Sequence, residues 1–340
     1  MIPNINILNN ATKLLFAIEL KPLQGERFQP TGFPSLGAAI YESKHGANLL
    51  VESAQSMANR LETVCWDESS DQPRKELTGL SYVRVERQGK YLTSSITEAH
   101  RLNSPYLLEG SDKTFFNQIK GELAVFDQGP IDRKQLARTL LKYDVSTLLH
   151  GVFLAKKELA GGRLRIARAL SAFIEAQGVR QAISGGVKND HVNPSGSTKE
   201  GFGNVPFSRE EFTADKITLF VNLDLAQIRG YGLGEDVEKL LVLLALFKLR
   251  VLLDGDLRLR TACNLEVKDA TVVATKPQGF ALPSAADLAE GLAAAIEKVK
   301  AQMSITTVTF NDELKKAKET DEAKTSTDEG EADGDDSVNS

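Results

Sequence analysis

The most chemically informative side chains near the N-terminus are hydrogen-bond donors. A loop rich in glycine and proline, residues 25–37, carries Arg27, Gln29 and Thr31. Guanidinium, amide and hydroxyl groups of this kind bind phosphates and base edges. No metal-ligand cluster or pair of carboxylates accompanies them, so the loop is expected to hold a ligand rather than to catalyse a reaction.

The next segment, residues 49–62, has the spacing of an amphipathic helix. Its apolar side chains recur every three or four residues and therefore share one face, formed by Leu50, Ala54, Met57 and Leu61. The opposite side carries three further donors, Gln55, Asn59 and Arg60. The loop and the helix together predict a binding surface for an anion.

Arginines also alternate with apolar residues in two later segments. Arg163, Arg165 and Arg168 form the first group, and Arg258 and Arg260 form the second. In a strand, such alternation places the guanidinium groups on one side and the apolar side chains on the other. A basic sheet face suits RNA phosphates, and a solvated face paired with acidic residues is the alternative. The aromatic signature of ordinary RNA-recognition motifs is missing.

Catalytic sites find little support in the sequence. No partner at metal-ligand spacing accompanies any of the four histidines, His45, His100, His150 and His191. There is no nucleophile elbow, and two cysteines are too few for a disulfide framework or a complete zinc site. The glycines at 185–186 and 196–203 match neither a P-loop nor a dinucleotide fingerprint. We expect no cofactor and no metal.

The composition is that of an ordinary globular protein, with 41% hydrophobic and 26% charged residues. No apolar run is long enough to span a bilayer and no secretory signal is visible, so a cytoplasmic location is expected. The net charge of −5 is unevenly distributed. Residues 311–340 hold eleven acidic residues and four lysines, a charge of −7, which leaves +2 for the rest. We expect a disordered acidic tail after a slightly basic folded body.

The secondary-structure elements that would position these residues are a mixture of strands and helices. The patterns predict strands at 13–20, 217–225 and 257–263, a hairpin at 81–96, and either a strand or a helix at 161–175. Helices are expected at 114–119, 132–143, 235–253 and 284–300, the last begun by a capping box at Ser284. Residues 184–212 have almost no regular propensity, as in functional or disordered loops. This order indicates an α+β fold, which a ferredoxin-like, RNA-recognition-type core fits.

Five of these blocks resemble a known family. Residues 25–34, 50–62, 162–168, 184–191 and 257–263 are similar to the backbone subunit of the type I-G (formerly I-U) CRISPR Cascade, a branch of the RAMP superfamily. The resemblance spans roughly residues 12–265, and its two N-terminal blocks are long enough to be specific. The acidic tail lies outside it.

The resemblance implies an RRM-like (ferredoxin-like) palm with a large inserted fingers region and a protruding thumb loop. The palm would be residues 1–24 and 151–310, the fingers 25–150, and the thumb 184–212 within the palm. Subunits of this family stack into a helical filament along the CRISPR RNA. They leave most guide bases free to pair with target DNA, so the protein contacts mainly the RNA backbone.

The implied function is therefore non-catalytic binding of a guide RNA in an antiviral complex. The implied partners are the guide RNA, target DNA through the guide, further copies of the chain, the end-cap or processing subunit, the large subunit and the recruited helicase-nuclease. No membrane partner is implied. The residues implied to bind RNA are Arg27, Gln29, Thr31, Gln55, Asn59, Arg60, Arg163, Arg165, Arg168, Lys188, Asn189, His191, Arg258 and Arg260.

Two other functions stay open at this point. One is a guide-directed RNA endonuclease, because backbone subunits of related type III complexes cut RNA with an acidic loop residue. Asp190 is the candidate for that role in this sequence. The other is a metabolic enzyme with a phosphate-binding glycine loop.

Overall fold

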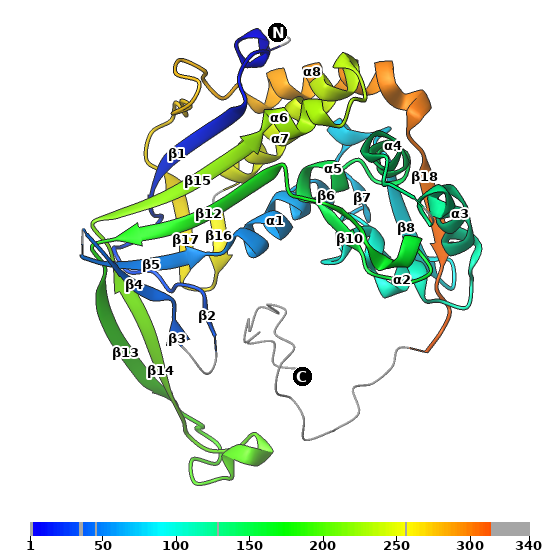
Figure 1. Ribbon diagram of the computed structural model, residues 1–340. Helices are drawn as coiled ribbons and strands as arrows, with labels where there is room; N and C mark the ends of the chain where they lie inside the picture. Colours follow the sequence, from blue (N-terminus) through cyan, green and yellow to red (C-terminus); the bar gives the residue numbers. More distant parts are fainter. Residues whose placement is uncertain (1–2, 34–36, 45, 128, 256, 314–340) are drawn as a thin grey trace.

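The computed structural model describes residues 3–33, 37–44, 46–127, 129–255 and 257–313. Its largest feature is an antiparallel sheet of seven strands in the order β16-β17-β1-β15-β12-β5-β4 (Figure 1). These strands are β1 (Lys13–Pro22), β4 (Ile40–Ser43), β5 (Gly46–Glu52), β12 (Leu170–Gln177), β15 (Lys216–Asp224), β16 (Leu257–Arg260) and β17 (Cys263–Val267). The fold is thus a mixed α+β fold, as the sequence predicted.

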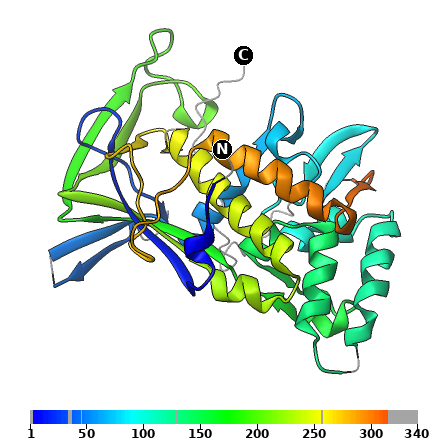
Figure 2. The same ribbon diagram turned by 90° about the horizontal axis from the view of Figure 1, so that it is seen from above.

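Alternation along the central strands gives the sheet one apolar face. Phe16 of β1 pairs with Val221 of β15, which pairs in turn with Ala172 of β12, and all three are buried. The helices on this side are α1 (Ala54–Thr63), α6 (Leu225–Gly230), α7 (Glu235–Asp254) and α8 (Ala285–Val299). Helix α1 packs on β12, α7 packs on α1, and α7 and α8 run side by side (Figure 2).

A helical lobe stands beside the sheet (Figure 1). Its helices are α2 (Pro105–Leu108), α3 (Thr114–Leu123), α4 (Arg133–Tyr143) and α5 (Thr147–His150). A three-stranded sheet completes the lobe, in which β8 (Tyr82–Arg87) pairs with β9 (Lys90–Ser94) and, in parallel, with β18 (Ile305–Thr309). Three short two-stranded ribbons are β2 (Gly32–Phe33) with β3 (Gly37–Ala38), β6 (Trp66–Asp67) with β7 (Gln72–Pro73), and β10 (Val152–Leu154) with β11 (Leu164–Ile166).

The region 184–212 was expected to have almost no regular structure, and this expectation was wrong at both ends, where residues 184–188 and 205–212 are strands. Between them, residues 189–204 form the expected loop, with one 3-10 turn at Thr198–Glu200. Strands β13 (Arg180–Lys188) and β14 (Val205–Thr213) form a long antiparallel hairpin that projects from the main sheet (Figure 1). Local propensity missed it because Gly185 and Gly186 weaken a strand signal. The cross-strand partner supplies the missing packing, since the ring of Phe207 lies against Gly186, within 3.1 Å of where a Cβ would stand.

Substituting Gly185 with valine should disrupt this hairpin. A Cβ at Gly185 would lie 2.7 Å from the carbonyl oxygen of Phe207, a backbone atom that cannot move without shifting β14. We expect Gly185→Val to destabilise the hairpin by about 1–3 kcal/mol, the usual range for forced steric overlap. Faster amide hydrogen exchange in residues 180–188 would reveal it. Val187→Ala, at an exposed position of the same strand, is the control and should leave the exchange unchanged.

Other expectations for single elements were mostly confirmed. The predicted helices, the hairpin at 81–96 and the cap at Ser284, whose Oγ accepts the Asp287 amide at 3.1 Å, are all present. The undecided segment 161–175 is extended, as β11 and β12. Two details were wrong: Leu50 belongs to β5 and not to the helix, and 257–263 is the start of a two-stranded hairpin and not one strand.

The predicted division into palm and fingers stays a prediction. Strands β4 and β5, from the proposed fingers, are part of the main sheet, and β18, from the proposed palm, pairs with β8 of the helical lobe. Most of the acidic tail lies outside the described residues, which end at residue 313. Among the described residues, no helix has both the length and the apolar character that a membrane span requires.

Candidate nucleic-acid interface

Helix α1 presents two of the predicted donors to solvent. Ser53 caps the helix, because its Oγ accepts the amide of Ser56 at 3.2 Å. Met57 and Leu61 are buried against the sheet. Gln55 and Asn59 are exposed and lie one helical turn apart, so their side chains are neighbours on the outer face.

A buried carboxylate fixes two arginines, Arg60 of α1 and Arg260 of β16. Glu52, at the end of β5, is only 1% exposed and bonds both guanidinium groups. Arg60 Nε donates to Glu52 Oε1 at 3.3 Å, and Arg260 Nη2 donates to Oε2. Arg60 also donates to the carbonyl oxygens of Arg258 at 3.2 Å and Leu259 at 2.6 Å, which fastens α1 to β16. Arg60 and Arg260 thus hold the framework of the interface together.

A cavity opens where α1, the end of α7 and β16 meet. Its volume is about 490 Å³. Its walls combine apolar side chains with the polar side chains Ser56, Asn59, Arg60, Thr63 and Arg258. Arg258 is exposed at its rim, and its side chain makes no ion pair with the described part of the chain. We call Gln55, Asn59, Arg258 and this cavity the α1 surface.

The structure therefore joins residues that are some two hundred positions apart in the sequence. Asn59, Arg60 and Arg258 line one cavity, and Arg260 Nη1 donates to the carbonyl oxygen of Gln29 at 2.9 Å behind it. Sequence reasoning missed Glu52, which organises the arginines, and the polar wall residues Ser56 and Thr63. A signal for the wall existed, since Ser56, Asn59 and Thr63 are spaced three and four residues apart, as on one helix face.

The predicted loop residues 27–31 lie at the base of the projecting hairpin. Phe28 exchanges backbone hydrogen bonds with Phe212 of β14, and Arg27 Nη1 donates to Glu211 at 2.9 Å. Thr31 is held through its backbone amide, which donates to the carbonyl oxygen of Val51 at 3.1 Å. These residues anchor the hairpin to β5 and are not part of the α1 surface.

The first arginine group has divided roles. Arg163 clamps a turn of the helical lobe, because its guanidinium donates to the carbonyl oxygens of Phe126 and Gly129. Arg168 Nη1 donates at 3.0 Å to the carbonyl oxygen of Ala54, in the first turn of α1. Arg165 is exposed on β11.

The thumb candidates Lys188, Asn189 and His191 are exposed near the tip of the hairpin, which projects away from α1 (Figure 1). Between them, Asp190 shapes the tip. Its Oδ1 accepts the amides of Val192 and Asn193, and its Oδ2 accepts the amide of Gly203, each at 2.9 Å. These backbone hydrogen bonds lower the pKa of Asp190. Its carboxylate thus holds the turn in place.

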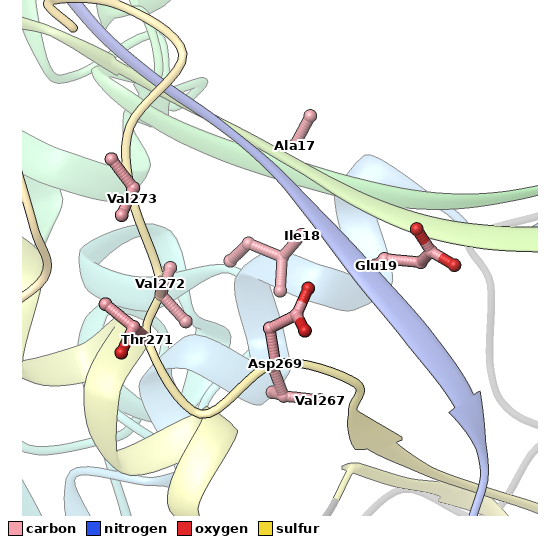
Figure 3. A pocket seen from close by; sticks show the side chains of 8 residues that line it. All are labelled: Ala17, Ile18, Glu19, Val267, Asp269, Thr271, Val272 and Val273. Atoms are coloured by element: carbon pink, nitrogen blue, oxygen red, sulfur yellow. The ribbon is translucent and has the colours of Figure 1, made fainter. Parts of the chain in front are cut away.

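A second cavity, of about 220 Å³, lies between β1 and residues 267–273 (Figure 3). Its ionisable side chains are Glu19 and Asp269, and Figure 3 shows the Asp269 carboxylate directed toward β1. Glu19 is already paired with Lys268 at 2.5 Å. An acidic lining repels phosphate, so this cavity does not suit an RNA backbone.

The cysteines and the buried histidine do not offer a reactive group. Cys65 and Cys263 are buried, and burial raises the pKa of Cys263 to about 11. Burial also holds the pKa of His150 well below its usual value, so this side chain is neutral. Among the residues that the structure describes, no group of His, Cys, Asp and Glu is arranged to hold a metal ion.

The sequence of this framework matches a protein-family model. Residues 14–181, from β1 to the start of β13, match the family described as CRISPR-associated protein GSU0053. The chain belongs to this CRISPR-associated family. The match includes α1 and β10–β11, and it ends before β16 and Arg258.

Other comparisons with this CRISPR-associated protein are weaker. None of the curated proteins matches it. Among solved structures, it is similar to a chain of a "CRISPR RNA-guided surveillance complex, pre-nicking", with a TM-score of 0.35 and 11% identity over 70% of this chain and 71% of that chain. This likeness is too distant to support a conclusion about fold or function.

Proposed function

We propose that this chain is the non-catalytic, guide-RNA-binding backbone subunit of a type I-G Cascade complex. The observation that carries the proposal is the α1 surface, where Gln55, Asn59 and Arg258 present unlike donors beside a cavity in a chain of a CRISPR-associated family. A mixed set of amide and guanidinium donors suits phosphate and ribose groups. Sequence would then be read by guide pairing and not by the protein.

The strand order supports an RRM-like palm. The chain runs through β1, α1, β12, β15, α7 and β17, and these four strands lie side by side in the order β17-β1-β15-β12. A β-α-β-β-α-β order with the first and third strands in the centre is the ferredoxin-like arrangement. The projecting hairpin would be the thumb, and its exposed apolar residues, among them Ile183, Phe202 and Phe207, suit contact with a partner.

The proposal includes the wider assembly. Copies of the chain would line up along one guide RNA and present its bases to target DNA. An end-cap or processing subunit, a large subunit and a recruited helicase-nuclease would complete the complex. Sequencing the RNA that co-purifies with the chain tests this directly, because repeat-derived guides are expected. Random cellular RNA, or none, would contradict it.

Removing Arg258 should weaken RNA binding without unfolding the protein. Its side chain is exposed, and the contact to Arg60 uses only its backbone oxygen. Arg258→Ala is expected to cost about 1 kcal/mol of binding free energy. It should also reduce the slope of log K against log salt by about 0.7, the value for one phosphate contact on a single strand. Fluorescence anisotropy over a salt series measures both.

The matched control for this substitution is Arg138→Ala. Arg138 is exposed on α4 of the helical lobe, so its substitution removes the same charge from another surface. Equal losses in the two variants would show a general charge effect and would remove the α1 surface from the proposal.

The alternative of a guide-directed RNA endonuclease finds no specific support in the geometry. Its candidate, Asp190, accepts three backbone amides of the hairpin tip with its two carboxylate oxygens. These three hydrogen bonds orient the carboxylate toward the backbone of the tip. We therefore assign Asp190 to the folding of the tip.

A further inference from the structure

The short ribbon β10–β11 exposes an aromatic ring beside a guanidinium group. Phe153 and Arg165 are direct cross-strand partners, so their side chains leave the same face of the ribbon. Phe153 is 53% exposed, whereas its neighbours Val152 and Leu154 are buried. Arg165 is exposed, and within the described part of the chain its side chain has no hydrogen bond or ion pair. About half of the Phe153 ring surface is therefore open to a ligand.

The ribbon is held rigidly. A Cβ at Gly151 would lie 2.8 Å from the carbonyl oxygen of Ile166, and one at Gly162 would lie 2.5 Å from that of Ala155, so both turns require glycine. The amide of Ala155 donates to Asn103 Oδ1 at 3.0 Å, which fixes the end of β10. The ring and the guanidinium group are thus presented in a fixed position, which lowers the entropy cost of binding.

The ribbon also lies next to the α1 surface. Arg168, three residues after Arg165, donates to the carbonyl oxygen of Ala54 at 3.0 Å, and Ala54 directly precedes the exposed Gln55. In Figure 1, β10 lies on the side of the helical lobe that faces α1. A strand of RNA that runs along α1 would therefore reach Phe153 and Arg165 next.

We propose that Phe153 and Arg165 form a platform for one nucleotide of single-stranded RNA. The phenyl ring would stack on the base, and the guanidinium group would bind the adjoining phosphate. Both contacts are general modes of binding single-stranded nucleic acid and do not depend on the base. This inference rests on the proposed function and adds a base-stacking contact to the α1 surface.

The surroundings favour RNA over a protein partner. The exposed residues near Phe153 along the two strands and the turn between them include Ala155, Lys157, Glu158, Arg163, Arg165 and Ala167. The ring is therefore a single large apolar group among small and charged side chains, most of the charged ones being basic. Protein interfaces more often present a contiguous apolar patch.

The test compares variants of the full chain in binding a fluorescein-labelled oligouridylate by anisotropy over a salt series. Phe153→Ala is expected to weaken binding about 5-fold or more, the lower range for one stacked base, with an unchanged salt slope. Arg165→Ala should weaken binding and also reduce the slope by about 0.7. Phe153→Trp should retain the affinity, because an indole ring also stacks.

Two controls separate the proposed platform from other effects. Ile305→Ala removes an apolar side chain of similar exposure, 57%, from β18, and Arg138→Ala removes a charge from α4. Neither should change the affinity. All variants should keep the urea midpoint of the wild type, because the altered side chains are exposed.

The outcomes distinguish this inference from the proposed function. If Arg258→Ala weakens binding and Phe153→Ala does not, the platform is wrong and the α1 surface stands. If Phe153→Ala leaves RNA affinity unchanged and reduces self-association in sedimentation, the ring serves a protein interface and the platform is again wrong. If the wild-type chain does not bind the RNA at all, both proposals fail.

Discussion

Glu52→Ala is expected to lower the free energy of unfolding by about 3–5 kcal/mol, the usual cost of removing one partner from a buried ion pair. Glu52 is almost fully buried, and Arg60 and Arg260, which it bonds, have side chains only 18% and 13% exposed. Without the carboxylate, two guanidinium groups would be close together and poorly solvated. The substitution should also disturb the α1 surface, because Arg60 holds the backbone at Arg258 and Leu259.

Urea unfolding followed by circular dichroism measures this effect. Glu42→Ala is the matched control: it removes the same side chain from an exposed position of β4, in the same sheet, and should change stability by less than about 0.5 kcal/mol. Similar unfolding curves for the two variants would mean that Glu52 does not organise the arginines. RNA affinity, measured below the unfolding transition, should fall for Glu52→Ala and not for Glu42→Ala.

The second large effect is expected from the ion pair that joins α1 to the helical lobe. Glu62, in the last turn of α1, receives Arg101 Nε at 2.7 Å and Arg101 Nη2 at 2.5 Å, and both residues are buried. Arg101→Met should cost about 3 kcal/mol, because it leaves a buried carboxylate without its bidentate partner. The expected cost is at the lower end of the usual range because the positive charges of Lys248 and Arg168 also stabilise the Glu62 carboxylate.

A double substitution gives this prediction its control. In the variant with both Glu62→Met and Arg101→Met, neither member of the pair is left as an unpaired buried charge, so much of the lost stability should return. A double variant that is less stable than Arg101→Met alone would show that packing, and not the unpaired charge, dominates. Thermal unfolding of the wild type, both single variants and the double variant completes the cycle.

Elements with strong local patterns could be predicted from the sequence. Asp132 caps α4 through the amides of Lys134 and Gln135, and the Gln88-Gly89 turn closes β8 and β9 with both residues at positive φ. These features depend on neighbours within a few residues, which is why the pattern shows them. The hairpin β13–β14 could not be predicted in the same way, because each of its strands is weak alone and is stabilised by the other.

The residues of the candidate site also differ in whether the sequence alone could identify them. The donors Gln55 and Asn59 could be found from helical spacing, and Arg258 from strand alternation. The roles of Arg60 and Arg260 could not be found in this way, because the carboxylate that holds them comes from β5. The sequence does not indicate which arginine a given carboxylate pairs with in the folded chain.

The sequence by itself determined the α+β class, most helices, the resemblance to a CRISPR-associated family and the residue types able to bind RNA. These depend on local periodicity and on side-chain chemistry, which the order of residues carries directly. Only the tertiary structure decided which arginines are available to a ligand, because pairing with Glu52, Glu211 or a backbone carbonyl depends on segments far apart in the chain. It also placed Phe153 beside Arg165, a pairing set by strand register.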